Sequence, residues 1–212
     1  MATTPWSTFY PYIQPHLPGC PEIVMESSLQ EASAKFLERS EVWRFEIEKD
    51  FATKNVADYP IFIPTKEAIL ENIYELILDG QPVSRVADKH VSSTRFTENG
   101  RPSCYTIFQD TSIRLYPTPD KRYTYSGWGV LKTKLSATGV EDWVFESHGR
   151  CISYGALAQL ASIPGKEWTN LELSMYYRQR FSKEMDDART REYRGVNSRV
   201  QAVNFAGRRR RR

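Results

Sequence analysis

Residues 98–135 constrain the fold of this chain more than any other stretch. The sequence there, ENGRPSCYTIFQDTSIRLYPTPDKRYTYSGWGVLKTKL, is rich in aromatic and β-branched residues, which favour strands. Two turn-rich segments, QDTS and PTPDK, divide it into three runs. We predict strands at residues 103–109, 112–116 and 122–135. Because their connections are short, we expect the three strands to form an antiparallel meander.

Strand patterns also precede this stretch. Residues 43–51, WRFEIEKDF, alternate apolar and charged side chains, which predicts a half-buried strand. The prolines of DYPIFIPT, residues 58–65, confine that segment to a sheet edge or a loop. Asp79-Gly80 separates two apolar runs and is typical of a β-hairpin. We therefore expect a β region at about residues 43–136, with a short irregular or helical piece at 86–93.

Helical periodicity flanks the β region on both sides. Apolar and small residues from Leu29 onward recur at i, i+3, i+4 and i+7, which predicts a helix at about residues 22–42. After Gly139 the pattern indicates two more helices, at about 142–163 and 169–194. Thr169 or Asn170 is a good N-cap for the last helix, and Gly195 is a good residue to end it.

These elements predict an α+β fold. We expect a helical bundle, made of one N-terminal and two long C-terminal helices, packed with a small antiparallel β-sheet or sandwich. This single domain would cover residues 1–195. Residues 196–212 contain no acidic residue and six arginines, which predicts an extended C-terminal arm that is flexible in isolation.

The positive charge of the chain is concentrated in its last five residues. The whole chain carries 29 basic and 26 acidic residues, a net charge of +3. Without Arg208–Arg212, 24 basic residues face 26 acidic ones, a net charge of −2. A nucleic-acid-binding face needs clustered lysine and arginine, so the body of the protein carries no general signature of one.

Other features exclude several classes of protein. No apolar stretch reaches the length of a membrane span, and MATTPWSTFYPY lacks the charged and apolar regions of a secretory signal. Cys20, Cys104 and Cys151 are an odd, widely spaced set, which indicates small buried residues in a reducing compartment rather than a disulfide framework.

We also predict no catalytic, cofactor-binding or metal-binding residues. The segment IPGKEW lacks the first glycine and the Ser or Thr of a phosphate-binding loop. His148 and Cys151 share a helix face, but no other Cys or His lies near them in the sequence. Glu184, Asp186 and Asp187 lie among cations on a charged helix, which favours a solvated face with i, i+4 pairs.

Three segments carry a resemblance to a known family. They are HLPGCPEIVMESSLQEASAKFLERSEVWR (residues 16–44), LILDGQPV (76–83) and ISYGALAQLASIPGKEWTNLELSMYYRQRFSKEMDDARTREYRG (152–195). In this order they resemble the head–tail adaptor, or connector, proteins of short-tailed bacteriophages, of the tail tubular protein A type. The resemblance covers most of the chain and rests on the succession of motifs rather than on any single one.

This resemblance implies a structural protein of the virion neck or tail, assembled in the host cytoplasm, and not an enzyme. It implies a ring of identical subunits, typically twelve, beneath the portal protein. The ring would continue the channel for genomic DNA, without sequence-specific binding, and carry the next tail component, a nozzle or tail tube. The C-terminal arm would dock into grooves of the portal. The five terminal arginines depart from the family pattern.

Two sets of residues follow as candidate binding sites. Phe205 is the best apolar anchor of the portal-docking arm, and tyrosine and arginine are enriched in protein interfaces. Tyrosine-rich stretches at residues 9–12, 122–128 and 176–180 suit either the core or an interface. The arm set is Asn204, Phe205, Arg208, Arg209, Arg210, Arg211 and Arg212, and the subunit-interface set is Tyr176, Tyr177, Arg180, Arg189, Arg191 and Tyr193.

Three alternatives stay open at this point. The first is a tail hub or tube component one position lower in the neck. The second is a DNA-binding module that uses its pentarginine end, and the third is an enzyme with an unrecognised site. Five arginines on phosphates would release about four or five counterions, so DNA binding by the second alternative would depend steeply on salt.

Overall fold

The chain folds into two compact units. The computed structural model describes residues 2–86, 99–108 and 111–205, with the backbone alone for residues 195–205. The helical unit comprises residues 1–42 and 133–212, and the β unit comprises residues 43–132. The predicted α+β class is confirmed. A single domain over residues 1–195 stays a prediction.

The helical unit is built mainly from three long helices. A short pairing of its first strand with its last ties the N-terminal residues to the start of the second long helix. The elements are β1 (Thr3–Pro5), a 3₁₀ helix η1 (Trp6–Phe9), α1 (Tyr10–Ile13), α2 (Glu22–Ser40), β12 (Gly139–Glu141), α3 (Asp142–Leu160) and α4 (Leu171–Phe205).

Helix α3 lies between α2 and α4. At Gly155 of α3, an added Cβ would lie 2.9 Å from the Ala32 Cβ of α2 and 2.8 Å from Phe181 of α4, so the helices approach closely there. The buried residues of α2 include Leu29, Ala32 and Phe36, at the spacing that the sequence predicts. The predicted first two long helices are confirmed, each ending two or three residues earlier than expected.

Helix α4 begins where the sequence predicts and continues further. The Asn170 side chain accepts a hydrogen bond from the Leu173 N–H at 3.0 Å, which confirms it as the capping residue. The predicted end at Arg194 is wrong, because the helix runs through Gly195 to Phe205. An interior glycine costs a helix only about 1 kcal/mol relative to alanine, and no proline follows to stop it.

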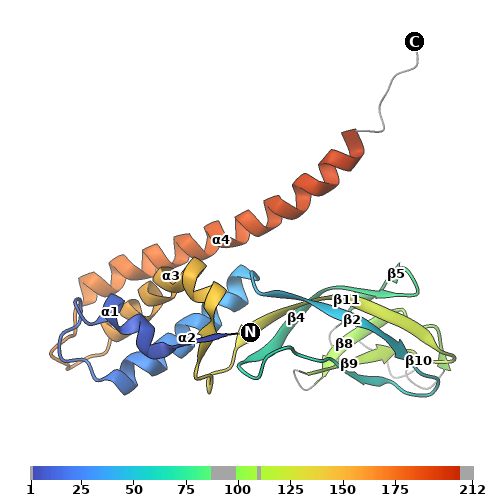
Figure 1. Ribbon diagram of the computed structural model, residues 1–212, viewed down its shortest axis with the longest axis horizontal. Helices are drawn as coiled ribbons and strands as arrows, with labels where there is room; N and C mark the ends of the chain where they lie inside the picture. Colours follow the sequence, from blue (N-terminus) through green and yellow to red (C-terminus); the bar gives the residue numbers. More distant parts are fainter. Residues whose placement is uncertain (1, 87–98, 109–110, 206–212) are drawn as a thin grey trace, which may run out of the picture. The chain divides into compact units, whose positions relative to one another are not determined.

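The C-terminal part of α4 extends beyond the other helices of its unit. Tyr193 still contacts Glu41, the residue that follows α2, whereas the helix continues to Phe205, past α2 and α3 (Figure 1). Residues 196–205, expected as an extended segment, are therefore helical. Residues 206–212, including all five terminal arginines, lie outside the described residues.

The β unit contains two four-stranded sheets. Their strand orders are β2-β11-β4-β5 and β3-β9-β8-β6, and a two-stranded pair joins β7 and β10. The strands are β2 (Arg44–Ala52), β3 (Asp58–Pro60), β4 (Ala68–Leu78), β5 (Gln81–Pro82), β6 (Ser84–Arg85), β7 (Asn99–Gly100), β8 (Cys104–Phe108), β9 (Ser112–Tyr116), β10 (Thr118–Pro119) and β11 (Tyr123–Thr133).

Local strand signals are confirmed in the β unit. Asp79 and Gly80 have φ of 46° and 73° and connect β4 to β5, as expected of a hairpin turn with two positive φ angles. Strand β3, which contains Pro60, lies at a sheet edge. The irregular or helical piece expected at 86–93 lies outside the described residues except for Val86.

The predicted three-strand meander is wrong in its third strand. Strands β8 and β9 pair antiparallel, but β11 belongs to the other sheet, where it pairs antiparallel with β2. Pro117 and Pro119 in the connection have no N–H to donate, so they interrupt a ladder that would otherwise continue on β9. Gly127 of β11 passes so close to β4 that an added Cβ would lie 2.2 Å from the Glu75 carbonyl oxygen.

Candidate functional site: an aromatic and arginine surface on α4

Helix α4 presents exposed tyrosine and arginine side chains in two pairs, which lie on different sides of the helix. Tyr176 is 49% exposed and Tyr193 is 37% exposed. Each lies four residues from an exposed arginine, Arg180 or Arg189, which places both members of a pair on the same side of the helix. We call Tyr176, Arg180, Arg189, Arg191 and Tyr193 the α4 surface.

The first pair holds an arginine against two tyrosine rings. Arg180 donates from Nε to the Tyr176 hydroxyl at 3.1 Å. Its guanidinium carbon lies 5.5 Å from the centre of the Tyr176 ring and 6.0 Å from that of Tyr154 on α3. The hydrogen bond with Tyr176 raises the pKa of Arg180. The guanidinium therefore stays charged beside the two aromatic rings.

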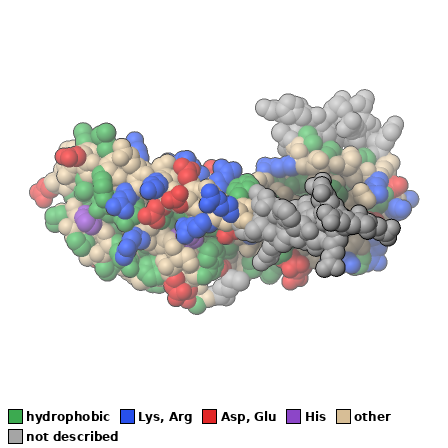
Figure 2. All heavy atoms as spheres, turned by 90° about the horizontal axis from the view of Figure 1, so that it is seen from above, with side chains coloured by type: hydrophobic (Ala, Val, Ile, Leu, Met, Phe, Trp, Pro, Cys, Tyr) green, Lys and Arg blue, Asp and Glu red, His purple; other side chains and the backbone are tan. Residues whose placement is uncertain are grey.

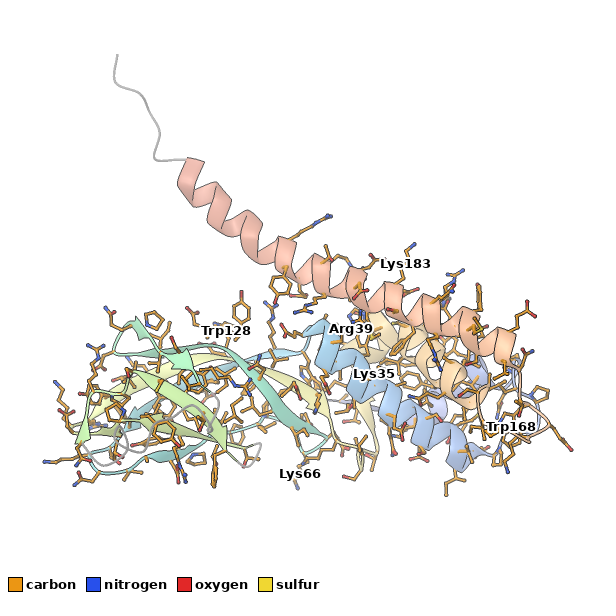
Figure 3. The ribbon with its side chains drawn as sticks, turned by 180° about the vertical axis from the view of Figure 1, so that it is seen from behind. Lys35, Arg39, Lys66, Trp128, Trp168 and Lys183 are labelled. Atoms are coloured by element: carbon orange, nitrogen blue, oxygen red, sulfur yellow. The ribbon has the colours of Figure 1, made fainter. Side chains whose placement is uncertain are left out.

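The second pair joins α4 to the end of α2. Arg189 lies over the Tyr193 ring at 5.5 Å, and the Tyr193 hydroxyl donates to Glu41 at 3.5 Å. Nearby, Arg39 near the C-terminal end of α2 points toward α4 (Figure 3), where its Nη2 donates to Asp186 at 2.8 Å. Both members of this ion pair are about half exposed, so it contributes about 1 kcal/mol at most.

Tyr177 differs from the rest of the predicted interface set. It is only 7% exposed, and its ring stacks on Tyr154 with centroids 5.4 Å apart. Its hydroxyl lies 3.4 Å from both ring nitrogens of His16. Tyr177 therefore supports the α4 surface from beneath, within its own chain.

A hollow of about 260 Å³ opens beside Tyr176 and Tyr177. Its wall combines α1, α3 and α4, and the Tyr12 ring on it is 42% exposed. We call this hollow the tyrosine pocket; its polar and aromatic lining residues are Tyr12, His16, Arg150, Ser153, Tyr154, Tyr176 and Tyr177.

Sequence reasoning did not predict this pocket, although two of its parts were noted. It singled out the stretches 9–12 and 176–180 as tyrosine-rich, and the structure brings these two stretches together. It did not single out Arg150 or Tyr154. Neither lies in a tyrosine-rich run, and only the packing of α3 between the other helices places them on the same wall.

Charged side chains of both signs continue along α4. An open depression of about 690 Å³ follows the side of the helix that carries Arg180 and Arg191, and basic and acidic side chains are mixed on the face seen in Figure 2. Such a mixed surface has the character of the polar rim of a protein interface, rather than of a uniformly basic DNA-binding face. The charged residues that line the depression are Arg180, Lys183, Glu184, Asp187, Arg191 and Arg194.

The histidine and cysteine on α3 are enclosed by the helical unit. His148 packs 4.8 Å from the Phe36 ring, and burial, with a smaller effect of Arg191, lowers its pKa. Burial also raises the pKa of Cys151 to about 12. Among the described residues, no three His, Cys, Asp or Glu side chains are grouped so as to hold a metal ion, and no helix is long and apolar enough to span a bilayer.

Only two of the predicted arm residues belong to the part of the chain that the structure describes. Asn204 and Phe205 form the last turn of α4, with backbone alone described, and Arg208–Arg212 lie outside the described residues. Their predicted contact with the portal therefore stays a prediction.

Comparison with known proteins identifies the family. No curated protein matches the chain. The profile of one family, described as SU10 adaptor protein, matches residues 22–204, from the start of α2 almost to the end of α4. The resemblance to phage head–tail adaptors is thereby confirmed. The chain belongs to the SU10 adaptor protein family, whose members are head–tail adaptors and hence structural components of the bacteriophage virion.

Proposed function

We propose that this protein forms a ring of identical subunits that joins the portal to the next tail component and continues the channel for genomic DNA. The observation that carries the proposal is the family match from α2 through α4, which gives the chain an adaptor role between head and tail proteins. Twelve subunits are expected from the resemblance to adaptors of short-tailed phages.

The geometry of α4 supports a docking role for the C-terminal segment. Beyond Tyr193, twelve further residues to Phe205 continue the helix, a length of about 18 Å at about 1.5 Å per residue. This part carries the chain past the end of α2 and leads to the pentarginine end. Arg208–Arg212 then provide five positive charges for carboxylates of the portal, while Phe205 provides an apolar anchor.

The α4 surface supports contact with other proteins. Tyrosine and arginine are the residue types most often found at energetic centres of protein interfaces, and the charged groups of both signs beside them suit a rim. DNA would pass through the ring without sequence-specific binding. The net charge of −2 without the last five residues is compatible with weak contacts to the phosphates.

Two truncations test the docking role. The first ends at Arg194 and removes the C-terminal part of α4 with the arginines. The second ends at Gly207 and removes the arginines alone. With purified portal rings, we expect full-length protein to co-sediment, the first truncation to lose binding, and the second to bind with a shallower salt dependence. Unchanged binding by the first truncation contradicts a docking arm.

Titration of the protein with duplex DNA distinguishes the adaptor ring from the alternative of a DNA-binding module. We expect full-length protein to bind duplex DNA weakly at physiological salt and to bind portal at the same salt. Tight DNA binding that depends on Arg208–Arg212 and weakens steeply with salt, without portal binding, supports the alternative instead. Images of the virion neck, in which the subunits of each ring are counted, test the ring itself.

A further inference from the structure

The tyrosine pocket has the chemistry of a socket for an apolar side chain flanked by carboxylates. Its lining residues include Arg150 but no acidic residue, and Arg180 stands at its edge over Tyr154 and Tyr176. Tyr12 and Tyr176 leave 42% and 49% of their surface exposed, so aromatic area is available for contact. An occupant that matches this wall offers an apolar group for the tyrosines and negative charge for the two guanidinium groups.

A ring of identical subunits needs two different surfaces that fit one another. Each subunit meets one neighbour with the first surface and the other neighbour with the second, because a head-to-tail contact closes into a ring. If the pocket is one of these surfaces, then the matching surface is present elsewhere on the same chain.

Five large apolar side chains of the described residues are more than 60% exposed: Ile23, Phe62, Leu135, Leu171 and Met175. Lys132 and Lys134 precede Leu135, Lys66 follows Phe62 by four residues, and Arg178 follows Met175 by three. Leu171 and Met175 lie on α4, the helix that also provides Tyr176 and Tyr177 to the pocket.

Ile23 has acidic neighbours and lies on α2, a helix that does not line the pocket. It is 77% exposed in the first turn of α2, between Glu22 and Glu26, and residues 2–34 contain no lysine or arginine. Within the helical unit, α2 begins on the side away from α4 and approaches α4 only toward its C-terminal end, as Figures 1 and 3 both show. The pocket is lined by α1, α3 and α4, whereas Ile23 lies in the first turn of α2. We call Ile23 with Glu22 and Glu26 the acidic knob.

We propose that Ile23 of one copy inserts into the tyrosine pocket of the next copy in the ring, with Glu22 and Glu26 facing Arg150 and Arg180. This rests on the ring of the proposed function and names the two surfaces that join its subunits. The tyrosine rings bury the isoleucine side chain, and the two arginines meet the two carboxylates at the edge of the contact. The contact is head-to-tail, so that each subunit inserts its Ile23 into one neighbour and receives the Ile23 of the other neighbour in its own pocket.

Cross-linking in assembled phage particles tests the contact. The variant Ile23→Cys/Tyr176→Cys is treated with a short bis-maleimide, which reaches exposed thiols, whereas the three native cysteines are buried. Because each subunit has one knob and one pocket, we expect a ladder of dimers, trimers and larger species on a denaturing gel. Each single variant, and the control pair Phe62→Cys/Tyr176→Cys, is expected to stay monomeric.

Charge reversal gives a second readout. Arg150→Glu/Arg180→Glu is expected to reduce ring formation on the order of tenfold, and adding Glu22→Arg/Glu26→Arg in the same chain is expected to restore it. Arg178→Glu, an equally exposed change on α4, is the matched control and leaves rings intact. Circular dichroism melting checks that every variant is folded.

The outcomes separate this inference from the ring itself. Necks that contain a ring by imaging but give no ladder with Ile23→Cys/Tyr176→Cys overturn the inference and leave the ring in place. Necks without a ring of this protein overturn the proposed function. A ladder that stops at dimers also contradicts the inference, since it indicates a symmetric contact rather than a head-to-tail one.

Discussion

Gly155 of α3 lies directly beneath the ring of Phe181 of α4: a Cβ built at Gly155 falls 2.8 Å from Phe181 Cζ, closer than real side chains approach. The same Cβ falls 2.9 Å from that of Ala32 on α2, so the position is closed from two sides. The three long helices of the helical unit therefore depend on a residue without a side chain at this crossing.

Replacing Gly155 with alanine is expected to destabilise the protein despite the higher helix propensity of alanine. Overpacking of a closed core position costs about 1–3 kcal/mol, which exceeds the gain in propensity of about 1 kcal/mol. The measurement is the free energy of unfolding from urea titrations. Ser147→Ala, at an exposed position of the same helix, is the control and changes the free energy little. An increase in stability for Gly155→Ala contradicts the close packing.

Replacing Gly195 with alanine is expected to stabilise the C-terminal part of α4, in contrast to the same change at Gly155. Since α4 runs through this residue, alanine favours the helix by about 1 kcal/mol, whereas proline disfavours it by about 3 kcal/mol. Amide hydrogen exchange of residues 196–205 reports the change, slower with alanine and faster with proline. If α4 instead ended at Gly195 in a left-handed conformation, alanine would speed exchange.

Acid is expected to weaken the helical unit through His148. Burial lowers its pKa in the folded state below the ordinary value of 6.5, so the unfolded chain takes up the proton first. Stability from this residue is complete above pH 6.5 and falls as the pH decreases below it. Thermal melts between pH 8 and pH 5 measure the slope, and the variant His148→Gln should show a smaller one. Equal slopes in both proteins rule out His148 as the cause.

The thiol of Cys151 is expected to be unreactive in the folded protein. Burial raises its pKa to about 12, and the residue is only 3% exposed, so at pH 8 almost no accessible thiolate is present. Mass spectrometry after brief treatment with iodoacetamide should find Cys151 unmodified without urea and modified in urea. Rapid modification of the folded protein at this residue would contradict the burial.

Local signals in the sequence predicted most elements of the fold. The periodicity from Leu29 identified α2, Asn170 marked the start of α4, and Asp79-Gly80 identified a hairpin. Each of these depends on residues within a few positions of one another. The α+β class follows from their order along the chain.

Contacts between distant residues were beyond sequence reasoning. Strand β11 follows β9 closely in sequence, yet it pairs with β2, about eighty residues earlier. The end of α4 was placed at Gly195 because glycine often stops a helix, although here the helix continues. The tyrosine pocket was not predicted: its two tyrosine-rich stretches were noted, but their meeting with Arg150 and Tyr154 depends on the packing of α3.

The continuity of α4 has a mechanical consequence. Its buried residues, among them Phe181 and Met185, are held in the helical unit, and the same hydrogen-bonded backbone continues to Phe205. A helix without a proline or a loop between these points transmits a tilt rather than absorbing it. A small rotation of α4 at the Gly155 crossing therefore becomes a larger displacement at the C-terminal end of the helix. Conversely, a force applied to that end is transmitted to the side chains packed around Phe181.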